Sequence, residues 1–243
     1  MYLKHITLKN FRAFYGEHTL EFSPTLGHSI SIVAGNNGHG KTSLLTALLW
    51  CLYGRQIEQV EESYKNDIKA KKNYENYIRD LINRKALEDE IPMAPRSYQA
   101  QSSAKPNSID YKNNHMYVEL VVGDFTLPFL TSEENQSMQL TLTIRRSVRI
   151  VSGVPFDSLS VIGSGTESFA FEDDSTRQTF ILNYVLPVEM AKFYLFDAER
   201  VVQIAQNFDS RDMQKQLAQN FEEIFGIKKY VEVKAKLQAS YER

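Results

Sequence analysis

The feature that most constrains this chain is a glycine-rich run at residues 35–42, with the sequence GNNGHGKT. It matches the pattern G-x-x-x-x-G-K-[ST] at every fixed position. The apolar run 29–34 before it predicts a buried strand, and residues 42–53 after it predict a helix that stops at Gly54. A strand, a glycine-rich loop and a helix in this order predict an α/β fold of the P-loop type.

The loop is expected to bind a nucleoside triphosphate through its main-chain amides. Its glycines let successive N–H groups turn inward at the positive end of the following helix, which makes a concave anion site. The ammonium group of Lys41 is expected to reach the β- and γ-phosphates and to act in catalysis, and the hydroxyl of Thr42 to ligate magnesium. ATP and Mg²⁺ are therefore the expected cofactors. The residues expected to contact the nucleotide in this loop are Asn36, Asn37, Gly38, His39, Gly40, Lys41, Thr42 and Ser43.

Composition narrows the class of protein. A chain of 243 residues with 42% hydrophobic residues can bury a sizeable core. Lys and Arg number 28 against 30 Asp and Glu, so any attraction to nucleic acid must come from a local basic patch. Cys51 is the only cysteine, which excludes an internal disulfide framework and fits the cytoplasm. No apolar run approaches about 20 residues, so a membrane span is not expected.

The rest of the chain predicts alternating strand and helix segments. Strands are expected at residues 3–8, 18–22, 116–122, 139–150 and 192–196. Helices are expected within 58–90, at 176–186 and from 201 nearly to the end. Residues 92–115 are rich in Pro, Ser, Asn and Gln and are interpreted as a mobile loop, so that 58–115 as a whole is interpreted as a mobile insertion. The strand at 192–196 is expected to be central and to end at Asp197, facing the nucleotide.

Two groups of segments carry a resemblance to known ATPases. Residues 10–16, NFRAFYG, together with 35–43 resemble the opening of SMC-like and SbcC-like ATPases, whose heads belong to the ABC class. In that family the arginine matching Arg12 lies beside the nucleotide phosphates. More specifically, four segments resemble DndD-like ATPases of bacterial DNA phosphorothioation systems, in the same order over nearly the whole chain. They are residues 52–55, 74–85, 186–189 and 193–200.

The resemblance implies a half-head of an ABC-type ATPase, with a mixed sheet, a β-rich flank and a terminal helix. Residues 1–225 would form its amino-terminal lobe and 226–243 the start of a coiled coil. Asp197 stands where related heads have the glutamine that senses magnesium and the attacking water, so it would contact the metal. Glu199 would act near that water, although a salt bridge or a helix cap explains it equally well. This chain has Ala198 where DndD-like proteins usually have glycine.

The resemblance also implies partners. The signature helix and the Walker B strand would come from a carboxy-terminal half of the same ATPase, so hydrolysis by this chain alone is expected to be weak. ATP would bring two heads together as a homodimer. The full-length protein would act on DNA with other DNA-modification proteins.

Two other functions fit the same residues. Residues 193–197 could be the Walker B strand of a compact, self-sufficient P-loop ATPase, or ATP could control a DNA-binding clamp. Candidate DNA contacts are weak, because charged runs are usually solvated faces. They are Lys65, Lys69, Lys71, Lys72, Arg145, Arg146 and Arg149.

Overall fold

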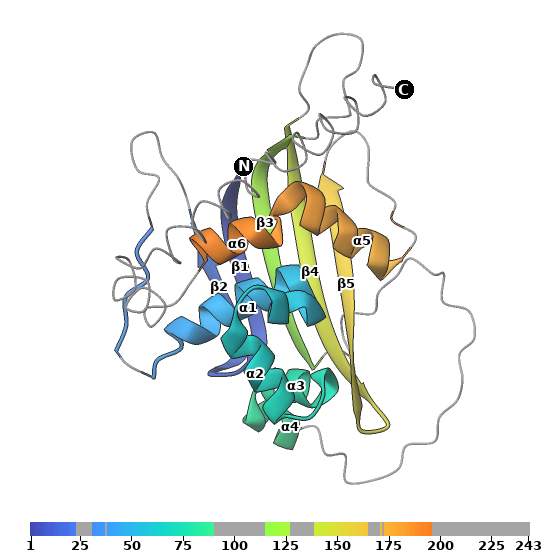
Figure 1. Ribbon diagram of the computed structural model, residues 1–243. Coiled ribbons are helices and arrows are strands. Elements are labelled where there is room, and N and C mark those ends of the chain that lie inside the picture. Colours follow the sequence, from blue (N-terminus) through green and yellow to red (C-terminus); the bar gives the residue numbers. More distant parts are fainter. Residues whose placement is uncertain are drawn as a thin grey trace, which may run out of the picture.

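A five-stranded antiparallel sheet forms one layer of the fold (Figure 1). The computed structural model describes residues 1–22, 31–36, 38–89, 115–126, 139–164, 171 and 173–195. The strand order is β2-β1-β3-β4-β5. The strands are β1 Tyr2–Phe11, β2 Phe14–Glu21, β3 Met116–Thr126, β4 Gln139–Val151 and β5 Val154–Ser164. The strands expected near the amino terminus, at 116–122 and at 139–150 are therefore confirmed.

Strand β5 was not among the expected strands, although a short sequence signal marks it. Ser152 and Gly153 join β4 to β5, and both have positive φ angles, 51° and 81°. Two consecutive positive φ angles are typical of the tight turn that matches the twist of a hairpin, and glycine favours it. Val151 pairs with Val154 directly across this turn. The Ser-Gly pair between two apolar runs could have predicted the hairpin.

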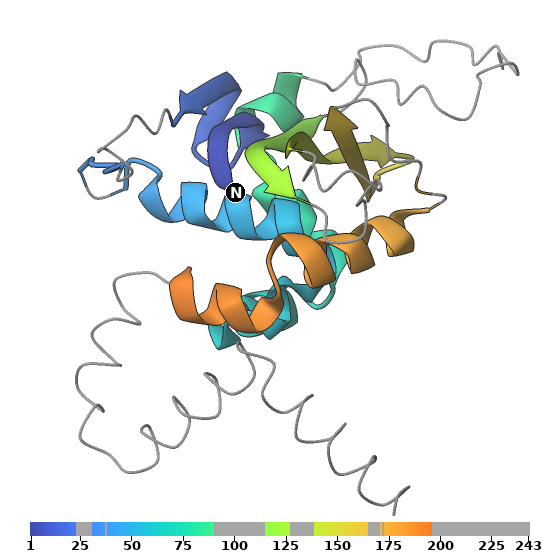
Figure 2. The same ribbon diagram turned by 90° about the horizontal axis from the view of Figure 1, so that it is seen from above.

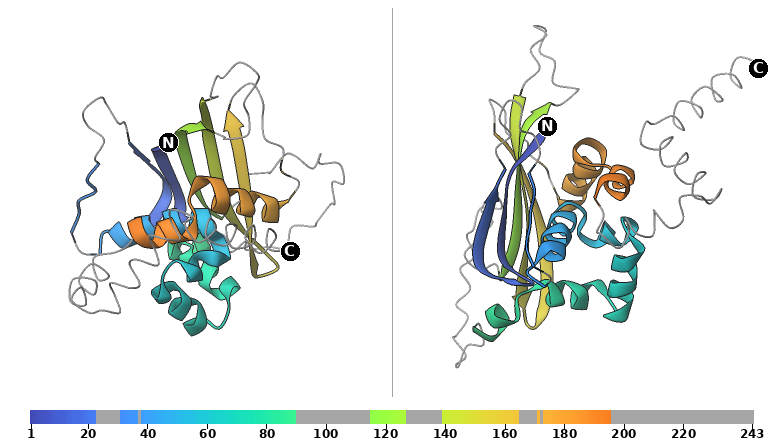
Figure 3. Two further views of the ribbon diagram at one scale, coloured as in Figure 1. Left: turned by 45° about the horizontal axis from the view of Figure 1, so that its top comes forward. Right: turned by 90° about the vertical axis from the view of Figure 1, so that its left-hand side faces the viewer.

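The helices cover one face of the sheet, except for the one at residues 84–89, which lies at the end of the sheet beside β2 (Figures 2 and 3). They are α1 Lys41–Tyr53, α2 Glu62–Ala70, α3 Tyr74–Leu81, α4 Arg84–Asp89, α5 Asp174–Phe180 and α6 Val188–Tyr194, with a 3-10 helix at Gly54–Gln59 and a π-helical turn at Ile181–Val185. Helix α1 packs directly on β1, β3 and β4, α2 lies on the far side of α1 from the sheet, and α3 packs on β5. The helix expected after the glycine-rich loop and the one expected to end before Pro187 are confirmed.

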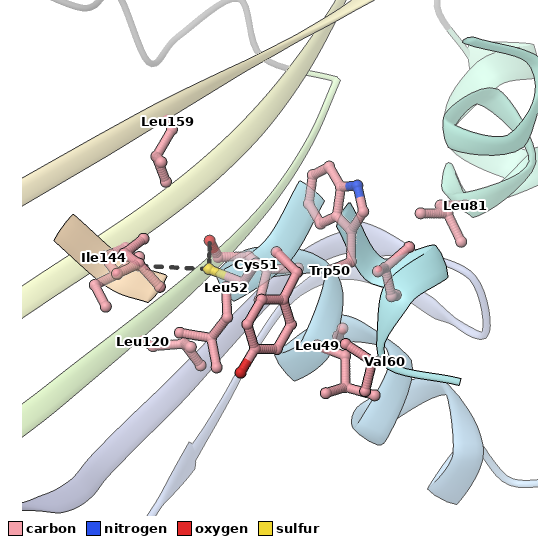
Figure 4. Packing of buried hydrophobic residues seen from close by; sticks show 14 of the residues in the cluster. Leu49, Trp50, Cys51, Leu52, Val60, Leu81, Leu120, Ile144 and Leu159 are labelled. Atoms are coloured by element: carbon pink, nitrogen blue, oxygen red, sulfur yellow. Dashed lines mark hydrogen bonds between the residues drawn. The ribbon is translucent and has the colours of Figure 1, made fainter. Parts of the chain in front are cut away.

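Helix α1 is the centre of the core, because its carboxy-terminal half is buried on all sides (Figure 4). Toward the sheet, the thiol of Cys51 donates hydrogen bonds to the carbonyls of Val118 and Ile144. Toward the helices, the indole Nε1 of Trp50 donates to the hydroxyl of Tyr74, at 3.1 Å. Burial raises the pKa of the Cys51 thiol to about 12, so the thiol stays protonated and packs as a small apolar group.

The strand expected at 29–34 is not formed over residues 31–34. Residues 31–36 have no regular structure and are exposed, and Ile32 is 87% exposed. A strand needs neighbours that take its backbone hydrogen bonds, and no strand in the described ranges pairs with this segment. The prediction of a buried strand is therefore wrong for residues 31–34.

The strand expected at 192–196 is also wrong where the structure describes it, because Val188–Tyr194 is helix α6. Pro187 precedes the first turn, and Val188 and Ala191 are buried one helical turn apart. The compact-ATPase interpretation placed its Walker B strand on this segment. Residues 196–243, which include Asp197, Glu199 and the expected terminal helix, lie outside the described residues.

The other expectations are met in part. The α/β class is confirmed, and every strand pair among the described residues is antiparallel, so this part of the sheet is not mixed. The insertion expected at 58–115 contains helices α2, α3 and α4, which are packed into the core through Tyr64, Tyr77 and Leu81. Residues 90–114 lie outside the described residues.

One buried arginine ties the carboxy-terminal end of α1 to the sheet. Arg146 of β4 donates from Nε to the carbonyl of Cys51 and from Nη1 to Asp157, each at 3.1 Å. Its Nη2 donates to Gln178 of α5, whose amide in turn donates to the carbonyl of Leu52. A cation at the last carbonyls of a helix is favourable. Arg146 is therefore structural, and it is not available to DNA.

We predict that Arg146→Met lowers the free energy of unfolding by about 3 kcal/mol, because it leaves the Asp157 carboxylate and the helix carbonyls without their cation. Arg149→Met, in the same strand but exposed, is expected to change it by less than about 0.5 kcal/mol. Urea unfolding followed by the fluorescence of Trp50, the single tryptophan, measures both. Equal losses in the two variants would contradict this role of Arg146.

Candidate functional site

The glycine-rich loop opens onto the first turn of α1. Gly38 and Gly40 have φ angles of 80° and 95°, and Gly40 is the N-cap of the helix. The first helical hydrogen bond runs from the Leu44 amide to the Gly40 carbonyl at 2.9 Å. The helix therefore begins directly at the loop, and its first turn has no acidic side chain. Unpaired N–H groups at such an end form a ready site for an anion.

The side chain of Lys41 lies back over this loop. Its ammonium donates to the carbonyls of Gly35 and Asn36, at 2.6 and 2.9 Å. An ammonium has three donors, so it can hold these two carbonyls and still donate to an anion. Thr42 is exposed beside it, so its hydroxyl is accessible as a hard oxygen ligand. Lys41 and Thr42 are the first two residues of α1. Asn37 lies outside the described residues.

The turn between β1 and β2 packs against the same loop. A Cβ atom at Gly40 would lie 3.0 Å from Cζ of Phe14 and 3.7 Å from Cβ of Ala13. Two features therefore favour glycine at position 40: the left-handed backbone conformation and the aromatic ring that packs against it. The packing role of Phe14 was not expected from the sequence.

Arg12, in this turn, reaches α1. Its Nη1 donates to the hydroxyl of Thr46 at 3.2 Å, and that hydroxyl donates to the carbonyl of Thr42 at 2.9 Å. The hydroxyl of Tyr64, from α2, lies 3.3 Å from the same oxygen. Arg12 thus contacts α1 one helical turn beyond Thr42. Thr46 was missed, although its position four residues after Thr42 puts both on one face of the helix.

Other candidates do not join this site. Lys65 and Lys69 are exposed on α2, whereas Lys71 is paired with Asp80. Arg145 pairs with Glu119 and lies 4.3 Å from the ring centre of Tyr117, on the other side of the sheet from α1.

Within the described ranges, no group of three or more His, Cys, Asp or Glu side chains could hold a metal ion. No helix among these residues is both long and apolar enough to cross a membrane.

Comparisons with known proteins agree with this geometry. A family model described as AAA domain matches residues 5–242. The chain is 37% identical over 68 residues to the chromosome partition protein Smc of Mycobacterium leprae, a match that covers 28% of this chain and 5% of that protein. For Smc of Mycobacterium tuberculosis the identity is 44% over 52 residues, covering 21% and 4%. For Smc of Synechocystis it is 33% over 75 residues, covering 29% and 6%. The aligned region thus spans only a small part of these relatives.

We predict that Gly40→Ala lowers the free energy of unfolding by about 3 kcal/mol, since the left-handed backbone and the contact with Phe14 both oppose a side chain. Gly38→Ala is the control, because an added Cβ there meets nothing within 4 Å and only the backbone term of about 1 kcal/mol remains. The same urea titration measures the difference. Equal losses would show that the Phe14 ring does not shape the loop.

Proposed function

We propose that this chain, which belongs to the AAA domain family, binds ATP with Mg²⁺ through residues 35–42 and the first turn of α1. The observation that carries the proposal is the arrangement of Gly40, Lys41 and Thr42 at the amino-terminal end of a buried helix. The family and the Smc relatives support an SMC-like ABC ATPase head. The nucleotide contacts are assigned to Arg12, residues 36–43 and, for magnesium, the Thr42 hydroxyl.

The residues present fit a magnesium-bound triphosphate. The loop amides and the end of α1 suit the phosphates, and Lys41 is already held over the loop by two carbonyls. When bound, Mg²⁺ neutralises charge on the β- and γ-phosphates. Arg12 adds a second positive charge near the same helix turn. The residues of this chain would therefore bind the phosphates and orient them for phosphoryl transfer.

An apolar surface beside the loop favours a half-head that another segment completes. Ile32 is exposed, and a cavity of about 260 Å³ lies next to the Lys41 side chain. It is lined by Leu3, Ile6, Phe22, Val33, Lys41, Leu44, Leu45 and Leu48. Apolar residues in such a place favour burial against other chain elements. We assign that role to the carboxy-terminal half of the same ATPase, which would also supply the remaining catalytic groups and make hydrolysis efficient.

Lys41→Ala is expected to weaken the affinity for Mg-ATP about a hundredfold, because it removes a charge-assisted contact to the phosphates. Isothermal titration calorimetry on the chain measures it. Lys65→Ala, which removes an exposed lysine from α2, is the control and should leave the affinity unchanged. Unchanged affinity in Lys41→Ala would refute the assignment of the site.

Two carboxylates complete the proposed mechanism. We assign Asp197 to the metal and Glu199 to the attacking water, from the resemblance of residues 193–200 to related ATPases. Asp197→Asn in the full-length protein is then expected to lower steady-state ATP hydrolysis at least tenfold, with Mg-ATP affinity changed less than threefold. Phosphate release and calorimetry measure the two quantities. Equal hydrolysis rates would remove Asp197 from the mechanism.

A more specific proposal concerns the full-length protein, which would couple ATP binding to the processing of DNA. It would act as a homodimer together with other DNA-modification proteins, in DNA phosphorothioation or an allied bacterial defence system. It rests on the resemblance of residues 52–55 and 74–85 to DndD-like ATPases. In the fold these two segments contact each other through the ion pair of Arg55 with Glu75, at 2.7 Å. Mass spectrometry of genomic phosphorothioate, with the parent protein and with Lys41→Ala, tests it. Identical levels of phosphorothioate with the parent protein and with Lys41→Ala would refute the role in DNA modification, but not the proposal that the chain binds ATP.

A further inference from the structure

The junction between α3 and α4 forms backbone hydrogen bonds with the β1–β2 turn, which contains Arg12. The Arg12 amide donates to the carbonyl of Leu81, and the Asn83 amide donates to the carbonyl of Asn10, both at 2.7 Å. Phe11 and Ile82 form an antiparallel bridge between these two bonds. A segment more than 70 residues further along the chain therefore holds the turn in place through its backbone.

Arg12 needs such support, because its backbone has a φ of 45°. Side chains other than glycine resist this left-handed conformation by about 1–2 kcal/mol. The Arg12 carbonyl accepts a hydrogen bond from Nδ2 of Asn83 at 2.6 Å. Both backbone polar groups of Arg12 are thus bound to the α3–α4 junction. The strained conformation is held from outside the turn.

The amide of Asn83 has a defined orientation. Its Oδ1 accepts from the amide of Lys85 at 3.0 Å, which caps the first turn of α4, so its Nδ2 faces Arg12. One side chain therefore stabilises two features, and the two are chemically separable. The cap needs only the acceptor oxygen, whereas the bond to Arg12 needs the donor nitrogen.

The guanidinium of Arg12 is held on α1 by its hydrogen bond to Thr46. Arg12 and Asn83 both line an open cavity of about 490 Å³, together with Asp80, Ile82 and Arg84. Arg12 therefore borders open space on one side. Its contact with Thr46 at the first turns of α1 depends on the backbone from which the side chain starts. A change at the α3–α4 junction would consequently redirect the charge near the phosphate loop.

We propose that Asn83 is a positioning residue for Arg12, and that through it the helical insertion α2–α4 sets how strongly the site holds the terminal phosphates of ATP. This inference rests on the proposed function, since it takes Arg12 to face the phosphates. Asn83 touches no reacting atom in this mechanism. It acts by keeping the Arg12 backbone in its left-handed conformation.

The test removes the hydrogen-bond donor of Asn83 and keeps the oxygen that caps α4. Asn83→Asp retains the acceptor for Lys85 and loses the donor to Arg12, so Mg-ATP affinity is expected to fall about tenfold with the melting temperature little changed. Asn83→Ser also retains a cap oxygen, but it is too short to reach Arg12 and adds no charge, so it should show the same loss. Calorimetry and thermal melting of the chain measure both variants.

A double-mutant cycle with Arg12→Ala decides whether Asn83 acts through Arg12. In that background Asn83→Asp should change the affinity less than twofold, because the residue that it positions is gone. The same tenfold loss in both backgrounds, or no loss in either Asn83 variant, would overturn the proposal. Failure of the proposed function looks different: the parent chain would not bind Mg-ATP, or Lys41→Ala would bind it equally well.

Discussion

The burial of the carboxy-terminal half of α1 is the constraint on which the other elements depend. Its carboxy-terminal half packs between the sheet and helices α2 and α3, and Trp50 and Cys51 bond in opposite directions to these two layers. A helix fixed in this way cannot tilt or shift without breaking the core. Its amino-terminal end, with the glycine-rich loop, therefore stays in a fixed place relative to β1 and β2.

Polar contacts hold the two ends of this helix by different means. At the carboxy-terminal end, Arg146 and Gln178 bind the last carbonyls and connect them to β5 and α5. At the amino-terminal end, Thr46 accepts from Arg12 and donates back to the helix. Arg146 and Thr46 are both buried, whereas Arg12 also lines an open cavity. Each end of α1 is therefore tied by an arginine from another part of the chain.

The sequence predicted the glycine-rich loop, α1 with its end at Gly54, and most of the antiparallel strands, because each has a local cause. The loop pattern, the apolar helix and the alternating strands are read within a few residues. It failed at 192–194, where an aromatic run was interpreted as a strand but folds as the end of α6. Aromatic residues favour strands, but this local preference is weak and tertiary context overrides it.

Residues 31–34 show a second kind of failure. Their apolar character is real, but a strand exists only with a hydrogen-bonded neighbour, which local sequence cannot specify. The basic residues 145 and 146 make the same point, since adjacent positions on β4 place one arginine in the core and the other on the opposite face.

By itself, then, the sequence determined the glycine-rich loop and the start of α1, because the glycines that take positive φ angles and the lysine that follows them stand together in one short run. Only the tertiary structure decided which distant residues serve that loop. Asn83 meets Arg12, and Phe14 meets Gly40, because the sheet and the helices fold these segments together. Such contacts depend on packing between elements far apart in the chain, and no local pattern encodes them.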